Sequence, residues 1–354
     1  IYFVHGNLYF DGSNFDLASN GLVRNKSMMR EYHLNTIILG IFIIIPIWAF
    51  VADEPFTITL MTRATVFSLA AVGLNIALGL GGLVSLGHAV FFGIGGYSMG
   101  ILAYHAQTFT PLMEWPILVS GSKSMPLIWI NAVLISALAA LIIGILSMRT
   151  SGVYFIMITL AFGQMFFFFS ISWSAYGGED GLSIYIRNGF PGLNTLVPLQ
   201  YYALCLALLC AILWVNSRLI KSPFGLALNA ARQVPERLET VGLHPMHLKL
   251  TAFIISGAIT GLAGALFADL NRFVSPTMFS WQTSGEMMVF VIIGGAGRLF
   301  GPVVGALVFV ALEHWLGSLS DFWHIYLGIL LLGIVLFGRG GLIGMICGEP
   351  HAHE

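Results

Sequence analysis

Long apolar runs without charged side chains constrain the fold of this chain more than any other feature. Residues 126–148 form one such run, and residues 152–173 form another. Hydrophobic residues make up 57% of the 354 residues and charged residues only 9%, whereas soluble domains are about 25% charged. An aqueous fold of this size cannot bury that much apolar surface, so most of the chain must lie in lipid. The sequence therefore predicts an all-α, polytopic helical membrane protein.

About ten segments are apolar enough to serve as transmembrane helices, which need about 20 apolar residues each. Eight or nine spans remain if a glycine-rich segment is re-entrant instead of spanning. We predict one transmembrane domain over residues 35–340, between a polar N-terminal segment (1–34) and a short tail (341–354). The predicted spans are 37–51, 64–80, 83–104, 126–148, 152–173, 201–215, 250–270, 285–294, 303–316 and 322–337.

The polar N-terminal segment lacks the apolar core of a signal peptide. Residues 7–13 resemble a protease-cleavable linker, and Met28 or Met29 offers a natural start. We therefore leave residues 1–27 out of the fold prediction.

The charged residues between the spans follow a consistent alternation. Cations precede the first span, and cytoplasmic loops of membrane proteins are rich in Lys and Arg. An N-terminus inside the cell places the cations Arg149, Arg298 and Arg339 inside and the acids Asp53, Glu54, Glu179, Asp180 and Asp321 outside. Arg63 and Lys123 are the exceptions, because both fall near outer ends. The pattern predicts that both termini are cytoplasmic.

The segment 217–249 clusters more charge than any other connection between apolar runs. It holds five of the 15 Lys and Arg residues, namely Arg218, Lys221, Arg232, Arg237 and Lys249. A short basic loop of this kind stays on the cytoplasmic side, where a helix can dock a cytoplasmic partner. The alternative is a solvated loop whose charge only sets the orientation of the chain.

Polar side chains at membrane depth are the candidates for a substrate pathway, because such residues face the interior of a helix bundle. Four glycines at 79–87 weaken a continuous helix, and unwound backbone at this depth must be buried or face water. The alternative for each polar residue is an interhelical hydrogen bond, and for Gly93, Gly95, Gly96 and Gly100 it is close helix packing. The candidate pathway residues are Asn75, Ser85, His88, Tyr97, Tyr154, Thr159 and Gln164.

Several other functions find little support in the sequence. His88 has no second ligand at metal-binding spacing, so we expect no metal site, and no basic stripe indicates nucleic acid. A secondary transporter would need buried carboxylates, but Asp269, Glu286 and Glu313 fall near span ends. A membrane enzyme would need a cluster of catalytic groups at one depth. The chain also lacks a phosphate-binding loop, so ATP would have to be hydrolysed by another protein.

Several motifs in order resemble the LivM-type permeases, which are membrane subunits of bacterial ABC importers for branched-chain amino acids. The resemblance runs over about residues 60–345 and is strongest in 73–97, 152–164, 177–182, 256–266 and 294–306. It implies a transport subunit in the bacterial inner membrane, which forms half of a pathway without catalysis or cofactor of its own. Similar permeases carry urea, short amides or aromatic acids, so these substrates remain alternatives, and an ion-coupled secondary transporter is a further one.

The resemblance also implies partners. These are a second, LivH-type permease subunit, two cytoplasmic ATPases that hold ATP and Mg, a periplasmic binding protein and the lipid bilayer. Glu179 and Asp180 would meet the binding protein, unless they are merely solvated. The family usually has a polar, acidic pair where Val234 and Pro235 stand, which leaves the start of the coupling helix open. The residues assigned to ATPase coupling are Phe224, Gly225, Ala231, Arg232, Glu236, Arg237 and Gly242.

Overall fold

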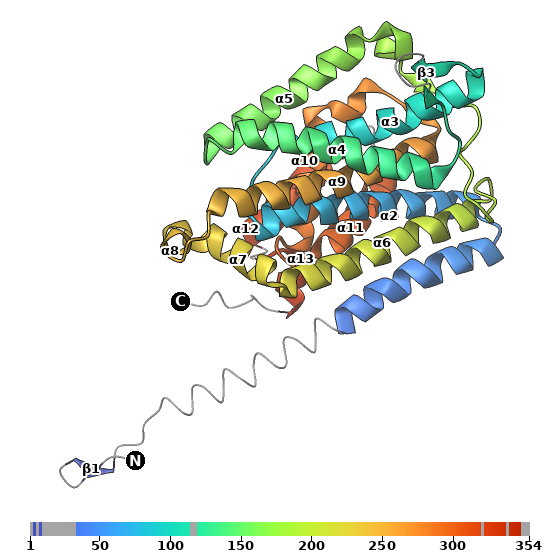
Figure 1. The fold of residues 1–354 in the computed structure, drawn as a ribbon. Helices are drawn as coiled ribbons and strands as arrows, with labels where there is room; N and C mark the ends of the chain where they lie inside the picture. Colours follow the sequence, from blue (N-terminus) through green and yellow to red (C-terminus); the bar gives the residue numbers. More distant parts are fainter. Residues whose placement is uncertain are drawn as a thin grey trace.

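The computed structural model describes residues 3–4, 7–8, 33–113, 119–319, 322–337 and 340–347, and those from 33 onward form a bundle of long helices (Figure 1). The predicted topology markers Asp321 and Arg339, and the cations that precede the first span, lie outside the described residues. Eight helices are long and apolar enough to cross a membrane, which confirms the all-α polytopic prediction. They are His33–Val51, α2 with the π-helix η1 (Pro55–Leu80), α3 (His88–Thr108), α4 (Met125–Ser147), α5 (Val153–Ser172), α6 (Pro198–Lys221), α9 (Pro245–Asn271) and α11 (Gly301–Leu319).

Shorter elements complete the described part of the chain. Five further helices are α7 (Pro223–Gln233), α8 (Pro235–Thr240), α10 (Trp281–Gly294), α12 (Trp323–Phe337) and α13 (Gly341–Cys347). Three two-stranded ladders pair β1 (Phe3–Val4) with β2 (Asn7–Leu8), β3 (Pro111–Met113) with β4 (Val119–Ser120), and β5 (Leu182–Ser183) with β6 (Phe273–Val274). Three single 3₁₀ turns are η2 (Ser174–Tyr176), η3 (Gly178–Asp180) and η4 (Pro276–Phe279).

Contacts between distant segments define two ends of the bundle. At one end, which we call the basic end, lie residues 79–82, 149–152, 217–249, 295–300 and 340. At the other, the acidic end, lie residues 52–54, 105–113, 174–196, 271–275 and 313–319. Among the described residues, the cations that the sequence placed inside lie at the basic end, and the acids that it placed outside lie at the acidic end. The alternation of the predicted spans therefore agrees with the tertiary contacts.

The span predicted over 285–294 is broken, not continuous. From the acidic end the chain runs through β6 and η4 before α10 completes the crossing to the basic end. Gly93 lies against the Phe279 ring and Gly96 against Met278, so the 3₁₀ turn is enclosed by α3. Non-helical backbone at membrane depth is tolerated where protein covers it, as it is here. This arrangement explains why α10 has only 14 residues.

The structure corrects several predicted boundaries. The second span begins at Pro55, not at 64, so Arg63 lies within α2 and not before it. The third span begins at His88, not at 83, because residues 81–87 are not helical and Gly82 has a positive φ of 69°. The sixth span continues to Lys221, so the first residues of the predicted coupling segment belong to α6. Residues 341–347 of the predicted tail form α13, and Gly341 packs against Gly295.

Helix α9 is the centre of the bundle and packs against α2, α3 and α4. Glycines permit this close approach, as the sequence suggested for the group at 93–100. A Cβ atom on Gly95 would lie 1.8 Å from the Gly261 carbonyl oxygen, and one on Gly264 would lie 1.9 Å from that of Phe92. Backbones this close leave no room for any side chain. The glycines therefore set the distance between α3 and α9.

We expect Gly264→Ala to destabilise the protein, because its methyl group would force α3 and α9 apart. Overpacking of this kind costs about 1–3 kcal/mol. Gly285→Ala is the control, since a Cβ atom there would meet nothing within 4 Å. Thermal unfolding in detergent should show a lower midpoint for Gly264→Ala only. An equal midpoint for both variants would contradict the role of this contact.

Candidate functional site: the coupling segment and the helix break beside it

The predicted coupling segment forms two short helices that lie at the basic end (Figure 1). Helix α7 starts at Pro223, and its Ser222 cap accepts a hydrogen bond from Gly225 N at 3.2 Å. It stops at Val234, where Pro235 cannot continue the hydrogen-bonding pattern, and α8 follows at once. The coupling helix that we expected is thus two helices with a corner at Val234.

The two helices turn different residues toward the bundle and toward solvent. Gly225, Leu228 and Ala231 of α7 are buried, and a Cβ atom on Gly225 would lie 2.3 Å from the Leu219 carbonyl oxygen. Gly225 and Ala231 therefore seat α7 on the protein. Phe224 is half-buried, whereas Glu236, Arg237 and Gly242 are exposed on α8 and its end.

Exposed apolar side chains lie along the same segment and were not predicted from the sequence. They are Leu226, Val234, Val241, Leu243 and Met246, of which Val241 is 78% exposed. Apolar patches rimmed by charge on an aqueous surface are typical of protein interfaces. The sequence feature that could have revealed them is the presence of isolated apolar residues in an otherwise polar, basic connection. We call this surface the coupling patch.

Arg232 connects the coupling segment to the transmembrane helices. Its Nη1 donates a hydrogen bond to the carbonyl oxygen of Gly79, near the end of η1. Its side chain lies over Gly82, where an added Cβ atom would come within 2.9 Å of the Arg232 Cγ. A guanidinium group bound to a helix-terminal carbonyl is a charge-assisted hydrogen bond. A displacement of α7 must therefore act on the end of α2.

Asn75 carries this contact further, to the loop between α10 and α11. It is fully buried, and its Oδ1 accepts from Gly297 N at 2.9 Å while its Nδ2 donates to Arg298 O at 2.9 Å. The two glycine-rich connections, 79–87 and 294–301, thus meet at the basic end. Asn75, a candidate pathway residue, lies where it holds two backbone segments together.

Three other candidate pathway residues are also buried between helices. Ser256 Oγ donates to Gly73 O at 2.7 Å, so His88 Nε2, at 2.8 Å from Ser256 Oγ, is the donor of that second bond. Ser85 Oγ accepts from Gly87 N at 3.2 Å, and Thr159 lies against Gly87. His88 therefore makes an interhelical hydrogen bond, Ser85 a hydrogen bond within the non-helical segment, and Thr159, whose hydroxyl donates to Ile156 O of its own helix, packs against that segment.

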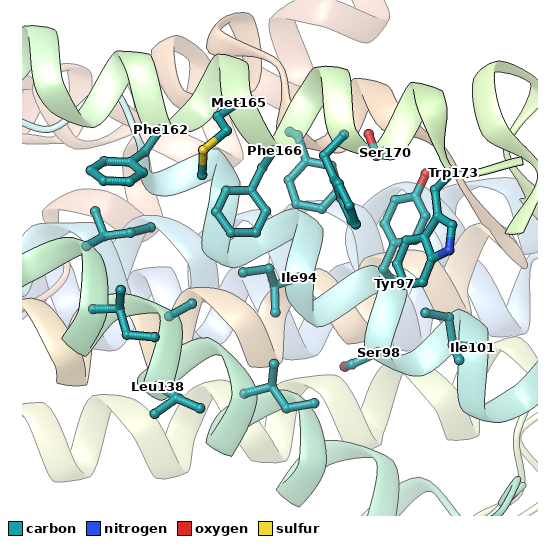
Figure 2. A pocket seen from close by; sticks show the side chains of 16 residues that line it. Ile94, Tyr97, Ser98, Ile101, Leu138, Phe162, Met165, Phe166, Ser170 and Trp173 are labelled. Carbon is teal, nitrogen blue, oxygen red and sulfur yellow. The ribbon is translucent and has the colours of Figure 1, made fainter. Parts of the chain in front are cut away.

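The remaining candidates lie on or near α5. Tyr97 borders an apolar cavity of about 440 Å³ between α3, α4 and α5. Figure 2 shows Phe162, Met165 and Phe166 projecting from α5 toward α3 and α4 across this cavity. Tyr154 is exposed, and Gln164 is half-buried. Neither Tyr154 nor Gln164 therefore takes part in the contacts described above around the non-helical segment 81–87.

At the acidic end, Glu179 and Asp180 form the exposed 3₁₀ turn η3. The loop that carries them is fixed to the bundle, because β5 pairs with β6 and Arg187 donates to Leu270 O at 2.9 Å. The two carboxylates are therefore presented on a supported surface.

Comparisons with known proteins place this site in context. A family model described as the permease component of the branched-chain amino acid transport system matches residues 56–338. The high-affinity branched-chain amino acid transport system permease proteins LivM of Salmonella typhimurium and Escherichia coli are each 27% identical to the chain, over 87% of it and 74% of their own length. The ribose import permease protein RbsC of Bacillus subtilis is 28% identical over 46% of the chain and 51% of its length. No solved structure matches the chain significantly.

We expect Asn75→Leu to loosen the 295–300 loop, because it removes both hydrogen bonds to that loop. Each buried backbone group left without a partner costs about 1–3 kcal/mol. Hydrogen exchange of the amides at 295–300 should be faster than in the wild type. Asn131→Leu, at a half-buried position in the first two turns of α4, is the control and should leave hydrogen exchange in this loop unchanged. Equal exchange in both variants would show that Asn75 does not hold the loop.

Proposed function

Because the chain belongs to the branched-chain amino acid transport system permease family, we propose that it is the permease subunit of an ABC importer for branched-chain amino acids. It forms half of the route through the membrane and carries out no chemistry itself. The observation that carries the proposal is the contact of Arg232 with Gly79, which joins a surface segment to a transmembrane helix. This is the connection that a permease driven by an external ATPase requires.

Several partners follow from this function. A second, homologous permease subunit completes the pathway, and two ATPases bind ATP and Mg²⁺. The coupling patch, with Glu236 and Arg237 beside it, is the surface that an ATPase contacts. A substrate-binding protein delivers the amino acid at the acidic end, where Glu179 and Asp180 are exposed.

The orientation in the inner membrane follows from the charge distribution. The basic end faces the cytoplasm, as Lys-rich and Arg-rich connections do. The first described helix begins at this end with His33, and the last described helix ends there with Cys347. Both observations support cytoplasmic termini.

The mechanism transmits motion through backbone contacts. Closure of the ATPases moves α7, and Arg232 passes that movement to the end of α2. Asn75 then moves the 295–300 loop with it, and α10 and α11 follow, because the loop connects them directly. The coupling surface and the membrane route are therefore two sites joined through rigid helices.

We expect Arg232→Ala to uncouple ATP hydrolysis from transport. The lost bond to a charged group is worth about 1.5–3 kcal/mol, so uptake per ATP hydrolysed should fall about tenfold or more. Arg218→Ala is the matched control, because Arg218 lies over the Trp214 ring at the end of α6. The measurement is of uptake and ATP hydrolysis together, in proteoliposomes that contain the whole transporter. Unchanged stoichiometry in Arg232→Ala would contradict this mechanism.

We expect Val241→Glu to weaken ATPase binding, because it places a charge in the apolar coupling patch. Burial of an unpaired charge in an interface should lower the affinity by about tenfold or more. Ser217→Glu adds the same charge at a half-buried position on α6 and serves as the control. Affinity can be measured with the purified ATPase and the permease in nanodiscs. Equal affinities for the two variants would exclude the coupling patch from the interface.

A further inference from the structure

Three charged side chains from three helices lie at one level of the bundle. Arg63 of α2 and Glu313 of α11 form an ion pair with 2.8 Å between Nη2 and Oε1. Glu286 belongs to α10, which packs against both α2 and α11. The level is fixed by the rings of Phe67, Phe290 and Phe309, which contact one another with centroid distances of 5.4 and 4.7 Å.

Each charged residue lies one helical turn from one of these rings, toward the acidic end. Arg63 precedes Phe67 by one turn, Glu286 precedes Phe290, and Glu313 follows Phe309 in the opposite helix direction. The three rings are buried and close the bundle beneath the charges. Arg63 lies about 12 Å along α2 from its first residue, so the cluster borders the acidic end of the bundle and is reached from it.

The cluster retains hydrogen-bonding capacity after the ion pair is made. Arg63 Nε and Glu313 Oε2 are both buried, and neither has a hydrogen-bond partner among the described residues. One is a donor on a cation and the other an acceptor on an anion. Buried polar groups normally find a partner, so this donor on the cation and this acceptor on the anion are available to a ligand that carries both charges.

The charges also do not balance. One guanidinium faces two carboxylates, and Glu286 is exposed on α10 next to the exposed Gln282, one turn away. An uncompensated carboxylate that faces hydrocarbon is costly, so this face of α10 must meet water or a cationic group. Glu286, which forms no ion pair with a described residue, offers an acceptor to the ammonium group of a ligand.

A groove leads to the cluster from the acidic end. Its volume is about 610 Å³, and its wall includes Arg63 and Glu313, whereas Glu286 of α10 lies outside that lining. Thr59, Asn271 and Ser318 give it polar groups, while Phe56, Leu60 and Val310 give it apolar ones. Such a mixed lining suits a small molecule with a charged head and an aliphatic side chain.

We infer that Arg63, Glu286 and Glu313 form a binding site for the zwitterionic head group of an α-amino acid on its way through the membrane. The α-carboxylate binds Arg63, and the α-ammonium group binds Glu313 and Glu286. The apolar groove wall receives the side chain. This inference rests on the proposed function, because it assigns a site to the amino acid that the permease carries.

Uptake of leucine by the whole transporter in proteoliposomes tests the inference. Glu286→Gln should raise the KM for uptake by about tenfold, because it removes a charge-assisted contact to the ammonium group. Glu54→Gln, an exposed carboxylate at the acidic end, is the control and should leave the KM unchanged. If the wild type takes up no leucine, the proposed function fails. If the wild type takes it up and Glu286→Gln does so with the same KM, the site is wrong.

A second measurement does not depend on transport. In the assembled transporter with Cys210→Ser and Cys347→Ser, Glu286→Cys should react with a cationic methanethiosulfonate faster than with an anionic one. Leucine together with the binding protein should slow this reaction. Phe290→Cys, on the buried face of α10, should not react. An unreactive Glu286→Cys would show that a partner subunit seals this face, and a reaction that leucine does not slow would exclude it from the amino acid route.

Discussion

The need to satisfy backbone polar groups inside a membrane governs this structure. Residues 81–87 interrupt the helices, and hydrocarbon offers their N–H and C=O groups no partners. The protein supplies them. Leu83 N donates to Ala77 O at 2.9 Å, and Gly87 N donates to Ser85 Oγ. Ala89 N, one of the first amides of α3, donates to Ser284 Oγ at 2.8 Å. The break is therefore stable because α10 and the segment itself complete its hydrogen bonds.

The end of the helix before this non-helical segment also leaves a backbone carbonyl group available to the coupling segment. A continuous helix has its carbonyl groups engaged, whereas the end of η1 presents the Gly79 carbonyl to Arg232. Asn75, one turn earlier, binds the second glycine-rich connection. In the mechanism that we propose, movement of α7 is transmitted through these contacts to two hairpins, α2–α3 and α10–α11. Close glycine contacts between α3 and α9 make this part of the bundle rigid enough to transmit it.

Some site residues could be chosen from the sequence, but their roles could not. Polar residues inside spans are few, so Asn75, Ser85, His88 and Thr159 stood out, and all four are buried at helix contacts. The sequence could not separate a pathway residue from an interhelical bond, because both need a polar group at depth. Arg63 looked like an exception to the charge pattern. It is paired with Glu313, a residue 250 positions away that no local pattern could connect to it.

The sequence by itself determined the class of protein, the approximate spans, their alternation and the family, since hydropathy, loop charge and motif order are local properties. Only the tertiary structure decided where helices are interrupted, that the coupling segment is two helices, and which side chains meet. The physical reason is that these features depend on contacts between helices. A glycine weakens a helix wherever it occurs, but a break persists only where neighbouring helices satisfy the backbone groups it frees.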